Sequence, residues 1–274
     1  MIRTHAFDAW LDRWSLVPDG DPFTTHSSLL LPVRRNGKAA MLKISIESEE
    51  RWGAGLMVWW EGVGAACVLE HEGDAILLER ALGARSLAGM VRAGQDDEAS
   101  RIICRTVAGL HAPRGKPAPA LVPLAERFQA LEPMAARLGG ILARSAGAAR
   151  ALLAEPRDVV PLHGDIHHGN ILDFGERGWL AIDPKRLEGE RGFDYANLFC
   201  NPDHVTALAP GRLARQADVV ARAAGLERQR LLQWILAWAG LSATWLIEDG
   251  QDELVAPTLR VAELALAELG PLWR

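Results

Sequence analysis

The sequence predicts an α+β fold in two parts, a β-rich N-terminal part to about Leu82 and a mainly helical part after it. Three observations support this prediction. The chain has 274 residues, of which 49% are hydrophobic, so it can bury a large core. Strand-like runs dominate the first part, and Asn36-Gly37 is a strong hairpin signal between two of them. Helical periodicity dominates from Asp97 onward.

The N-terminal part is expected to open with a helix and to continue with two antiparallel strand pairs. Phe7, Trp10 and Trp14 recur at helical spacing in the opening segment. The expected elements are a helix over residues 6–16, strands over 28–34 and 39–46, a helix over 47–60, and a strand pair over 68–69 and 75–79. Gly53 and Gly55 weaken the prediction of the second helix, because glycine is a poor helix former.

The second part is expected to consist mostly of amphipathic helices. They are predicted over residues 97–111, 124–138, 145–153, 205–224 with a break near Pro210-Gly211, 231–247 and 254–269. The helix over 231–247 carries a stripe formed by Trp234, Trp238 and Trp245. Such a stripe belongs more often to a protein core than to a ligand-binding surface.

Bulk properties restrict the classes of function. The net charge of -5 and the lack of a Lys/Arg block argue against a nucleic-acid partner. No apolar run reaches the roughly 18 residues of a membrane span, and the N-terminus lacks a signal-peptide core, so we expect a cytoplasmic protein without a membrane partner. Cys67, Cys104 and Cys200 are scattered, which indicates buried free thiols. The oligomeric state is left open.

The stretch from Val160 to Pro184 concentrates the chemistry of the chain. Asp165 and Asn170 lie five residues apart on a loop with two glycines, which lets the backbone turn tightly enough for both side chains to face one pocket. A hairpin after Asn170 would bring Asp183 back beside it. A carboxylate and an amide oxygen suit Mg²⁺, and Asp165 stands ready to receive a proton.

Residues 173–175 read D-F-G, the same letters as the metal-binding motif of protein kinases. Asp173, however, falls in the hairpin turn, roughly 10 Å along a strand from Asn170. We therefore expect Asp183 to be the metal ligand and Asp173 to be a turn residue.

Two further sets of residues leave alternatives open. Lys43 stands in a largely apolar strand, where it is either an edge-strand charge that reaches into water or a phosphate ligand. His163, His167 and His168 are compatible with a zinc site, although no Cys or remote His pair completes one. His163 otherwise suits a structural role beneath the loop. His167 and His168 could face acceptor, phosphate or solvent.

The segment H-G-D-I-H-H-G-N-I-L, followed by A-I-D-P-K and F-D-Y-A-N, resembles the catalytic core of the aminoglycoside and hydroxyurea phosphotransferase family, in particular the branch that contains streptomycin kinases. The strand with Lys43, the Trp59-Trp60 pair and L-L-E-R-A-L match more loosely. The resemblance implies a bilobal fold like that of protein kinases, with a nucleotide-binding lobe over residues 1–82 and a catalytic and acceptor-binding lobe over residues 83–274.

The resemblance also implies roles for individual residues. Asp165 would be the catalytic base, and Asn170 and Asp183 would hold Mg²⁺. Lys43 would contact the α- and β-phosphates of ATP, with GTP also compatible. Lys43 would pair with an acid near the start of the helix over 47–60, for which we choose Glu50 over Glu49.

Further implied roles concern the surroundings of this site. Asp194 would brace the catalytic loop through backbone N–H groups, and the adenine would lie near Glu79 to Ala81. The phosphate-covering loop F-T-T-H-S-S-L has no glycine, unlike that of protein kinases. Ser27 and Ser28, with Thr25, would have to bind the phosphates there.

The predicted function is therefore an ATP- and Mg²⁺-dependent transfer of the γ-phosphate to a hydroxyl of a small molecule, such as the aminoglycoside streptomycin. Hydroxyurea or an unrelated metabolite is an alternative acceptor. A catalytically silent kinase-like binding protein is the other alternative, supported by the missing glycines. The acidic run from Glu248 to Glu253 would suit a cationic acceptor, although such a run is more often a solvated loop.

Overall fold

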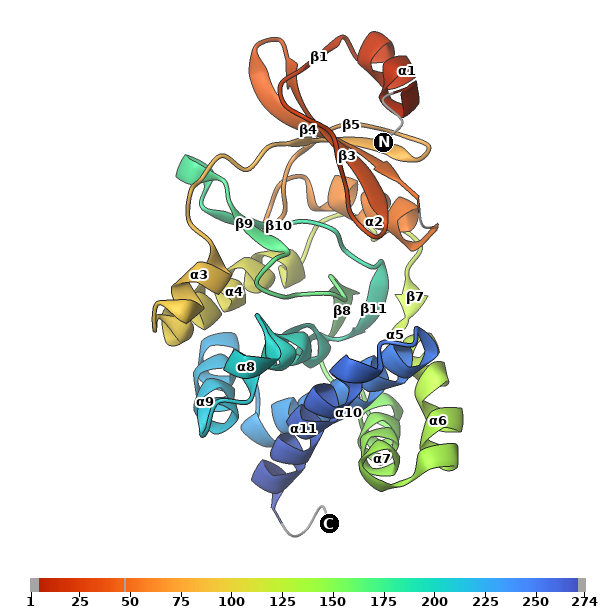
Figure 1. Ribbon diagram of the computed structural model, residues 1–274, viewed down its shortest axis with the longest axis vertical. Coiled ribbons are helices and arrows are strands. Elements are labelled where there is room, and N and C mark those ends of the chain that lie inside the picture. Colours follow the sequence, from red (N-terminus) through yellow and green to blue (C-terminus); the bar gives the residue numbers. More distant parts are fainter. Residues whose placement is uncertain (1–4, 47, 271–274) are drawn as a thin grey trace.

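Residues 5–46 and 48–270 are described by the computed structural model, and they form two lobes joined by a short linker (Figure 1). The N-terminal lobe, red to orange, holds an antiparallel sheet and two helices. The C-terminal lobe, yellow to blue, consists mostly of helices. The predicted bilobal α+β fold is therefore confirmed. A boundary at Leu82 stays a prediction; this residue lies in the linker between β6 and α3.

The N-terminal lobe is built on a six-stranded sheet in the order β1-β3-β4-β6-β5, with β2 paired to β3. Its elements are α1 (His5–Arg13), β1 (Leu16–Pro18), β2 (Phe23–Thr24), β3 (Ser28–Arg35), β4 (Lys38–Ser45), α2 (Ser48–Trp60), β5 (Val68–Glu72) and β6 (Ala75–Glu79). The predicted helices and strand pairs match these elements to within a few residues. β1 and β2 are too short to leave a periodic pattern in the sequence.

Asn36 and Gly37 form the turn between β3 and β4, as predicted. Both have positive φ, 49° and 77°, which a tight two-residue hairpin requires and which Asn and Gly adopt at low cost. The turn fixes a register in which Leu30 lies opposite Lys43. Because side chains alternate between the two faces of a sheet, this register decides which face carries Lys43.

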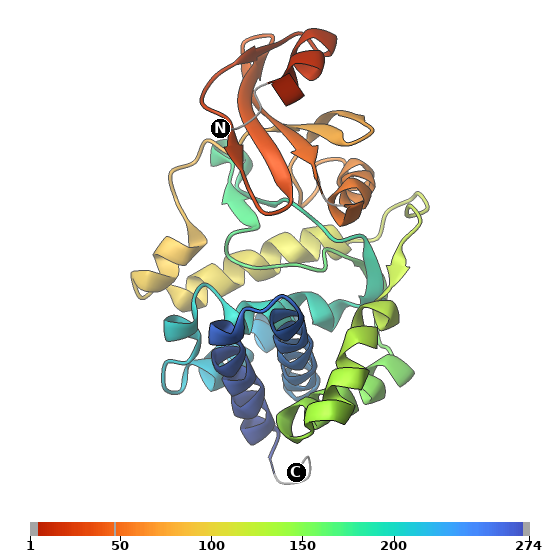
Figure 2. The same cartoon turned by 45° about the vertical axis from the view of Figure 1, so that its right-hand side comes forward.

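The two faces of the sheet contact different helices. On one face, Leu42 and Leu77 join a small core with Phe7 of α1. On the other face, Ile76 joins the main core together with residues of α2. Lys43 lies opposite Ile76 in the β4–β6 pair and therefore points to the α2 face. This face is turned toward the C-terminal lobe, with α2 between the sheet and α4 (Figure 2).

Gly53 lets α2 lie directly against the backbone that follows Asp183. A β-carbon built on Gly53 would stand 2.1 Å from the carbonyl oxygen of Pro184, which is an overlap. Sequence reasoning counts this glycine only as a cost to the helix. The contact gives it a purpose, because any side chain there would push α2 away from the C-terminal lobe.

The segment between α2 and β5 binds the C-terminal lobe through its backbone. Ala66 N donates to Ala181 O, and Ala181 N donates to Gly64 O, both at 2.9 Å. Gly64 has a φ of 76°, and a β-carbon on it would lie 2.8 Å from the backbone nitrogen of Leu110. The backbone conformation and the close approach both require glycine. These hydrogen bonds therefore attach the N-terminal lobe to the C-terminal lobe at Ala181, two residues before Asp183.

The C-terminal lobe combines helices with two small sheets, one formed by β9 and β10 and the other by β7, β11 and β8. Its elements are α3 (Leu87–Arg92), α4 (Asp96–His111), β7 (Val122–Pro123), α5 (Leu124–Arg127), η1 (Phe128–Ala130), α6 (Leu131–Leu138), α7 (Gly140–Ala154), β8 (Val159–Leu162), β9 (Ile171–Asp173), η2 (Gly175–Arg177), β10 (Trp179–Ala181), β11 (Leu187–Glu190), η3 (Arg191–Cys200), α8 (His204–Ala207), α9 (Arg212–Ala224), α10 (Arg228–Glu248) and α11 (Asp252–Leu269). The helix predicted over 124–138 is divided into α5, η1 and α6. The other predicted helices are confirmed.

The helix α10 runs through the core of this lobe. Trp234 and Trp238 are only 1% and 8% exposed, so their predicted place in the core is confirmed. Trp245 is half-buried, and the guanidinium of Arg127 lies 4.7 Å from its ring centroid. In the described ranges, α10 is the one helix long and apolar enough to cross a membrane, but 67% of its apolar window is buried within the protein. This finding is weak support for a span, because core helices pass the same test.

The three cysteines are free thiols, as predicted, but of the three only Cys104 is buried, while Cys67 and Cys200 are half-buried. Burial raises the pKa of Cys104 and of Cys200 to about 12. Both therefore stay protonated and unreactive at neutral pH.

We expect Gly53→Ala to destabilise the protein, by about 1–3 kcal/mol, because the added methyl group forces α2 and Pro184 apart. Thermal unfolding of the two proteins measures this. Gly55→Ala is the matched control on the same helix, since nothing lies within 4 Å of its added carbon. It should stabilise the helix by up to about 1 kcal/mol. Equal melting temperatures for the two variants would contradict the contact.

Candidate active site

The loop between β8 and β9 carries Asp165 and Asn170, and the two residues contact each other. Asn170 Nδ2 donates to the backbone oxygen of Asp165 at 2.9 Å and to its Oδ2 at 3.3 Å. Asn170 N donates to His167 O at 3.0 Å, which closes the loop. Because the amino group of Asn170 is used inside the loop, its Oδ1 is the atom that can face a cation.

The predicted hairpin after Asn170 is confirmed. β9 pairs antiparallel with β10, with Ile171 opposite Ala181. Ile182 N then donates to Asn170 O at 2.9 Å, so the next residue, Asp183, lies beside Asn170. Asp183 has a φ of 61°, which residues other than glycine rarely adopt. Such conformations cluster at functional sites, where the surrounding structure enforces them.

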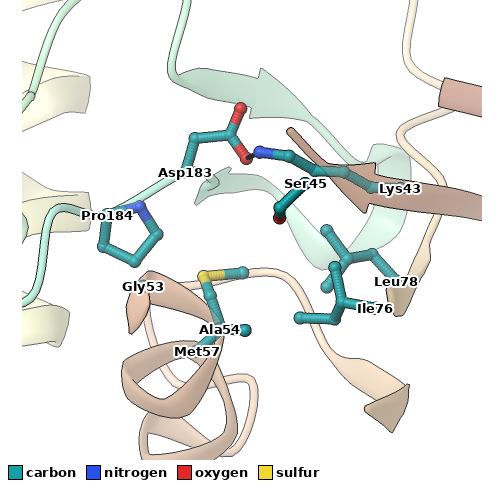
Figure 3. Close-up of a pocket in the computed structure, with 9 residues that line it drawn as sticks. All are labelled: Lys43, Ser45, Gly53, Ala54, Met57, Ile76, Leu78, Asp183 and Pro184. Carbon is teal, nitrogen blue, oxygen red and sulfur yellow. Dashed lines mark hydrogen bonds and ion pairs between the residues drawn. The ribbon is translucent and has the colours of Figure 1, made fainter. Parts of the chain in front are cut away.

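Lys43 forms an ion pair with Asp183 across the boundary between the lobes (Figure 3). Lys43 Nζ lies 2.6 Å from Asp183 Oδ1. β4 is an interior strand and Lys43 is only 5% exposed, so the alternative of a solvated edge-strand lysine is wrong. The pocket around the pair is lined by Ser45, Gly53, Ala54, Met57, Ile76, Leu78 and Pro184. In this apolar setting the Asp183 carboxylate compensates a buried ammonium that would otherwise cost several kcal/mol.

The acid proposed to pair with Lys43 is not settled by these contacts. The side chains of Glu49 and Glu50 lie outside the part of the chain that the structure describes. The choice of Glu50 therefore stays a prediction.

Asp194, in η3, binds the backbone at the start of the loop between β8 and β9. Its carboxylate is 1% exposed and accepts hydrogen bonds from His163 N at 2.9 Å and from Gly164 N at 2.7 Å. His111 Nε2, at the end of α4, lies 2.8 Å from the same carboxylate. Three donors on a buried carboxylate compensate its loss of water.

His163 connects this loop to the strand that leads to Asp183. Its Nε2 donates to Ile182 O at 2.7 Å, and its Nδ1 accepts from Asp165 N at 3.2 Å. A carbonyl can only accept, so Nε2 carries the proton. Burial lowers the pKa of His163, which keeps the ring neutral and this tautomer in place. The ring also stacks on Trp60.

His167 and His168 have different environments. His167 Nδ1 accepts from Gly169 N at 3.0 Å. His168 is 4% exposed, and neither ring nitrogen has a hydrogen-bond partner among the described residues. Burial lowers the pKa of His168 to about 4. No group of three His, Cys, Asp or Glu side chains in the described ranges is arranged to hold a metal, so the zinc alternative gains no support there.

Asp173 is the last residue of β9, opposite Trp179, so its prediction as a turn residue is wrong by a short distance: it ends the strand just before the turn formed by η2. Arg85 donates to it through Nε at 2.7 Å and Nη2 at 3.1 Å, and Gly175 N donates to it at 3.1 Å. The hydrogen bond from Arg85 is the main reason that the pKa of Asp173 falls to about 2. Gly83 N donates to Asp173 O at 2.9 Å, so this residue ties the linker to the hairpin.

The turn between β2 and β3 is the predicted phosphate-covering loop. Thr25 N donates to Ser28 O at 2.9 Å, and Ile46 N donates to Ser27 O at 2.8 Å. Ser28 is fully buried, with no hydrogen-bond partner for its hydroxyl among the described residues, whereas Ser27 is half-buried. In this conformation the Thr25 N–H and the Ser28 hydroxyl both face the protein. Phosphate binding by Ser27 and Ser28 stays a prediction.

The residues proposed to lie near the adenine differ in the hydrogen-bonding groups that they can present to it. Glu79 Oε1 accepts from Cys67 N at 2.6 Å and pairs with Arg177 of the hairpin turn. Within the described ranges, no hydrogen bond uses the N–H of Ala81. A backbone donor is therefore present at the position predicted for the adenine, while the Glu79 side chain is already engaged.

Sequence reasoning assigns no role to three residues that the structure places around the site. Asn197 Nδ2 donates to Asp165 Oδ1 at 2.9 Å. Arg85 of the linker binds Asp173, and Arg177 of the hairpin turn binds Glu79 at the end of β6 and Gly62 O after α2. For Asn197 the available signal is the segment F-D-Y-A-N, which also contains Asp194. The two arginines leave no local signal, because their partners lie far along the chain.

The donor atoms suit Mg²⁺. Asn170 offers its amide oxygen and Asp183 a carboxylate that is 31% exposed, both hard oxygen ligands. Two protein ligands are typical for Mg²⁺ that keeps several waters and binds nucleotide phosphates. The Asp183 carboxylate already stabilises one positive charge, the ammonium of Lys43, which lies against it.

Comparison with known proteins identifies relatives over most of the chain. Residues 13–250 match the family model described as aminoglycoside/hydroxyurea antibiotic resistance kinase. The chain is 52% identical to the streptomycin 3''-kinase of Klebsiella pneumoniae, over 94% of this chain and 98% of the relative. It is 35% identical to the streptomycin 6-kinase of Streptomyces griseus, over 94% and 87%. It is 33% identical to the hydroxyurea phosphotransferase of Kitasatospora aureofaciens, over 95% and 78%.

Solved structures share the fold at low sequence identity. A thermostable mutant of aminoglycoside phosphotransferase APH(4)-Ia, in a ternary complex with ADP and hygromycin B, has a TM-score of 0.70 and 12% identity, with 98% of this chain and 100% of that chain covered. Amicoumacin kinase hAmiN, in complex with AMP-PNP, Ca²⁺ and Ami, has a TM-score of 0.68 and 13% identity, with 96% and 94% covered. With the family model and the close relative, they lead to one conclusion: this chain belongs to the aminoglycoside/hydroxyurea antibiotic resistance kinase family and has its kinase-like fold.

Proposed function

We propose that this protein transfers the γ-phosphate of ATP to the 3''-hydroxyl of streptomycin. The observation that carries the reaction is the convergence of Asp165, Asn170 and Asp183 on one loop and hairpin, with Lys43 reaching in from the other lobe. The 52% identity to a streptomycin 3''-kinase over nearly the whole chain supports the acceptor and its position.

Asp165 is the proposed catalytic base. Its side chain is half-buried on the loop, and its two carboxylate oxygens accept from Asn197 and Asn170. A carboxylate held in this way can orient the acceptor hydroxyl and take its proton as the phosphate is transferred. His163 and Asp194 fix the backbone on which it stands.

Asn170 and Asp183 are the residues that would hold Mg²⁺. When bound, the ion neutralises charge on the phosphate groups. Lys43 would contact the α- and β-phosphates, with Glu50 proposed as its partner. The adenine would lie along the linker near Ala81, and Ser27 and Ser28 would cover the phosphates. The complexes of the solved relatives with ADP and AMP-PNP support ATP as the donor, and GTP is a second candidate.

A cationic acceptor fits the charge of the protein. The net charge of -5 attracts a cation over long range. Glu248 and Asp249 are exposed at the turn between α10 and α11, which makes this run a solvated turn. It does not by itself locate the acceptor. Because ATP is the donor, we place the reaction in the cytoplasm.

Hydroxyurea is the second candidate acceptor, supported by the 33% identity to a hydroxyurea phosphotransferase. The deciding experiment offers streptomycin, a second aminoglycoside and hydroxyurea separately, with Mg²⁺ and either ATP or GTP. Mass spectrometry detects the added phosphate, and NMR of the product locates it. We expect streptomycin 3''-phosphate. Phosphate at position 6 would correct the regiochemistry, and phosphorylated hydroxyurea alone would replace the acceptor. Nucleotide binding without any transfer would favour the silent binding protein.

We expect Asp165→Ala to lower the rate of transfer by about 10²–10⁴-fold, the usual contribution of a general base. Calorimetric affinity for Mg-AMP-PNP should stay within a factor of about two, since Asp165 faces the acceptor. Asp173→Asn is the control, because Asp173 binds Arg85 instead of the site. It should retain the wild-type rate within a few-fold. Wild-type transfer by the Asp165 variant would contradict the assignment.

Asp183→Asn should weaken metal-dependent nucleotide binding by at least about tenfold, because it removes a charged oxygen ligand. Titration of AMP-PNP with Mg²⁺ and with EDTA measures the metal-dependent part. In EDTA the variant and the wild type should bind alike. The substitution also leaves Lys43 opposite a neutral group, so melting temperatures must accompany the titration. An unchanged Mg²⁺ dependence would remove Asp183 from the metal site.

A further inference from the structure

Asn197 and Asn201 form a chain of amide hydrogen bonds that ends on Asp165. Asn201 Nδ2 donates to Asn197 Oδ1 at 2.8 Å and to Asn197 O at 2.9 Å. Asn197 Nδ2 in turn donates to Asp165 Oδ1 at 2.9 Å. Asn197 is 6% exposed, and Asn201 is half-buried. The hydrogen bonds are therefore largely shielded from competing water.

The negative charge of Asp165 determines how each side-chain amide in this series of hydrogen bonds is oriented. A carboxylate only accepts, so the amino group of Asn197 must face Asp165 and its carbonyl oxygen must face away. That oxygen needs a donor, which Asn201 supplies. Each amide thus has one favourable orientation, and a flip of either amide would set two acceptors against each other.

The carboxylate of Asp165 needs such a restraint to act as a base. Rotation of a carboxylate about its last side-chain bond is soft, with broad minima, so packing alone aligns the oxygens poorly. Here Asn197 binds Oδ1 and Asn170 binds Oδ2. The two amides together define the plane of the carboxylate and leave its remaining lone pairs for an acceptor hydroxyl.

Asn197 belongs to the same 3-10 helix as Asp194. Asp194 holds the loop backbone at His163 and Gly164, while Asn197, three residues later, holds the side chain of Asp165. η3 therefore contacts the catalytic loop twice, once at the main chain and once at the reacting group.

We infer that Asn197 is a positioning residue that orients Asp165 for phosphate transfer, and that Asn201 sets the orientation of Asn197. This inference rests on the proposed function, since it assigns Asp165 the task of binding the acceptor hydroxyl. A misaligned base slows transfer without changing nucleotide binding, because neither asparagine contacts the proposed metal ligands in the hydrogen bonds described.

The test is a double-mutant cycle on phosphate transfer. Asn197→Ala should lower kcat by about 10- to 100-fold, with the KM for ATP unchanged. Asn201→Ala should lower it by a smaller factor. In the Asp165→Ala background, Asn197→Ala should have no further effect, because its action passes through Asp165. Independent, multiplicative losses would overturn the inference, and so would a wild-type kcat for Asn197→Ala.

Gln216→Ala is the matched control for a purely structural loss. Gln216 is 2% exposed, accepts from Ser100 Oγ at 2.7 Å and donates to Asp97 Oδ1 at 2.8 Å, both partners belonging to α4 and not to the loop that carries Asp165. Its removal should lower the melting temperature and leave kcat unchanged. If Gln216→Ala lowers kcat as much as Asn197→Ala does, the effect of Asn197 is one of general stability and the inference fails.

A second readout does not depend on activity. The side-chain amide protons of Asn197 should exchange slowly with solvent in the wild-type protein and faster in Asp165→Ala, as NMR of the labelled protein measures. Fast exchange in the wild type would overturn the positioning contact even in an active enzyme. Slow exchange together with wild-type activity of Asp165→Ala would instead overturn the proposed function and leave the contact intact.

Discussion

The arrangement of the site depends on the hydrogen bonds that the buried carboxylate of Asp194 accepts. A charge that is 1% exposed is unfavourable unless hydrogen bonds replace its water, and each such bond to a charged group is worth about 1.5–3 kcal/mol. The donors come from two different places, the loop backbone at His163 and Gly164 and the ring of His111. The hydrogen bonds to this one charge therefore join η3, the end of α4 and the start of the loop between β8 and β9.

The hairpin formed by β9 and β10 connects this support to the rest of the molecule. It binds the linker through Asp173 with Arg85 and the end of β6 through Arg177 with Glu79. Its second strand exchanges backbone hydrogen bonds with the segment after α2. Asp183 lies two residues after the end of this strand, so contacts with both lobes and the linker restrain the segment that leads to it. This explains how a strained φ of 61° is maintained there.

Sequence reasoning recovers the features whose causes are local. Asn36-Gly37 sets a hairpin because the turn chemistry lies in two adjacent residues, and the hairpin between Asn170 and Asp183 follows from spacing alone. Features that depend on distant partners are not recoverable in this way. Gly53 reads as a defect in a helix until Pro184 is seen beside it, and Lys43 reads as ambiguous until β4 is known to be an interior strand. The roles of the site residues themselves stay predictions that follow from family resemblance.

Glycines occupy several points where the C-terminal lobe meets the N-terminal lobe or the linker. Gly53 lies against Pro184, Gly64 against Leu110, and Gly83 against Asp173, each with a missing β-carbon that would overlap its neighbour. With no side chain to compress, these points cannot come closer. Close approach at these three points therefore depends on the absence of a side chain, and any other residue there would hold the C-terminal lobe farther from α2, from the segment after α2 or from the linker.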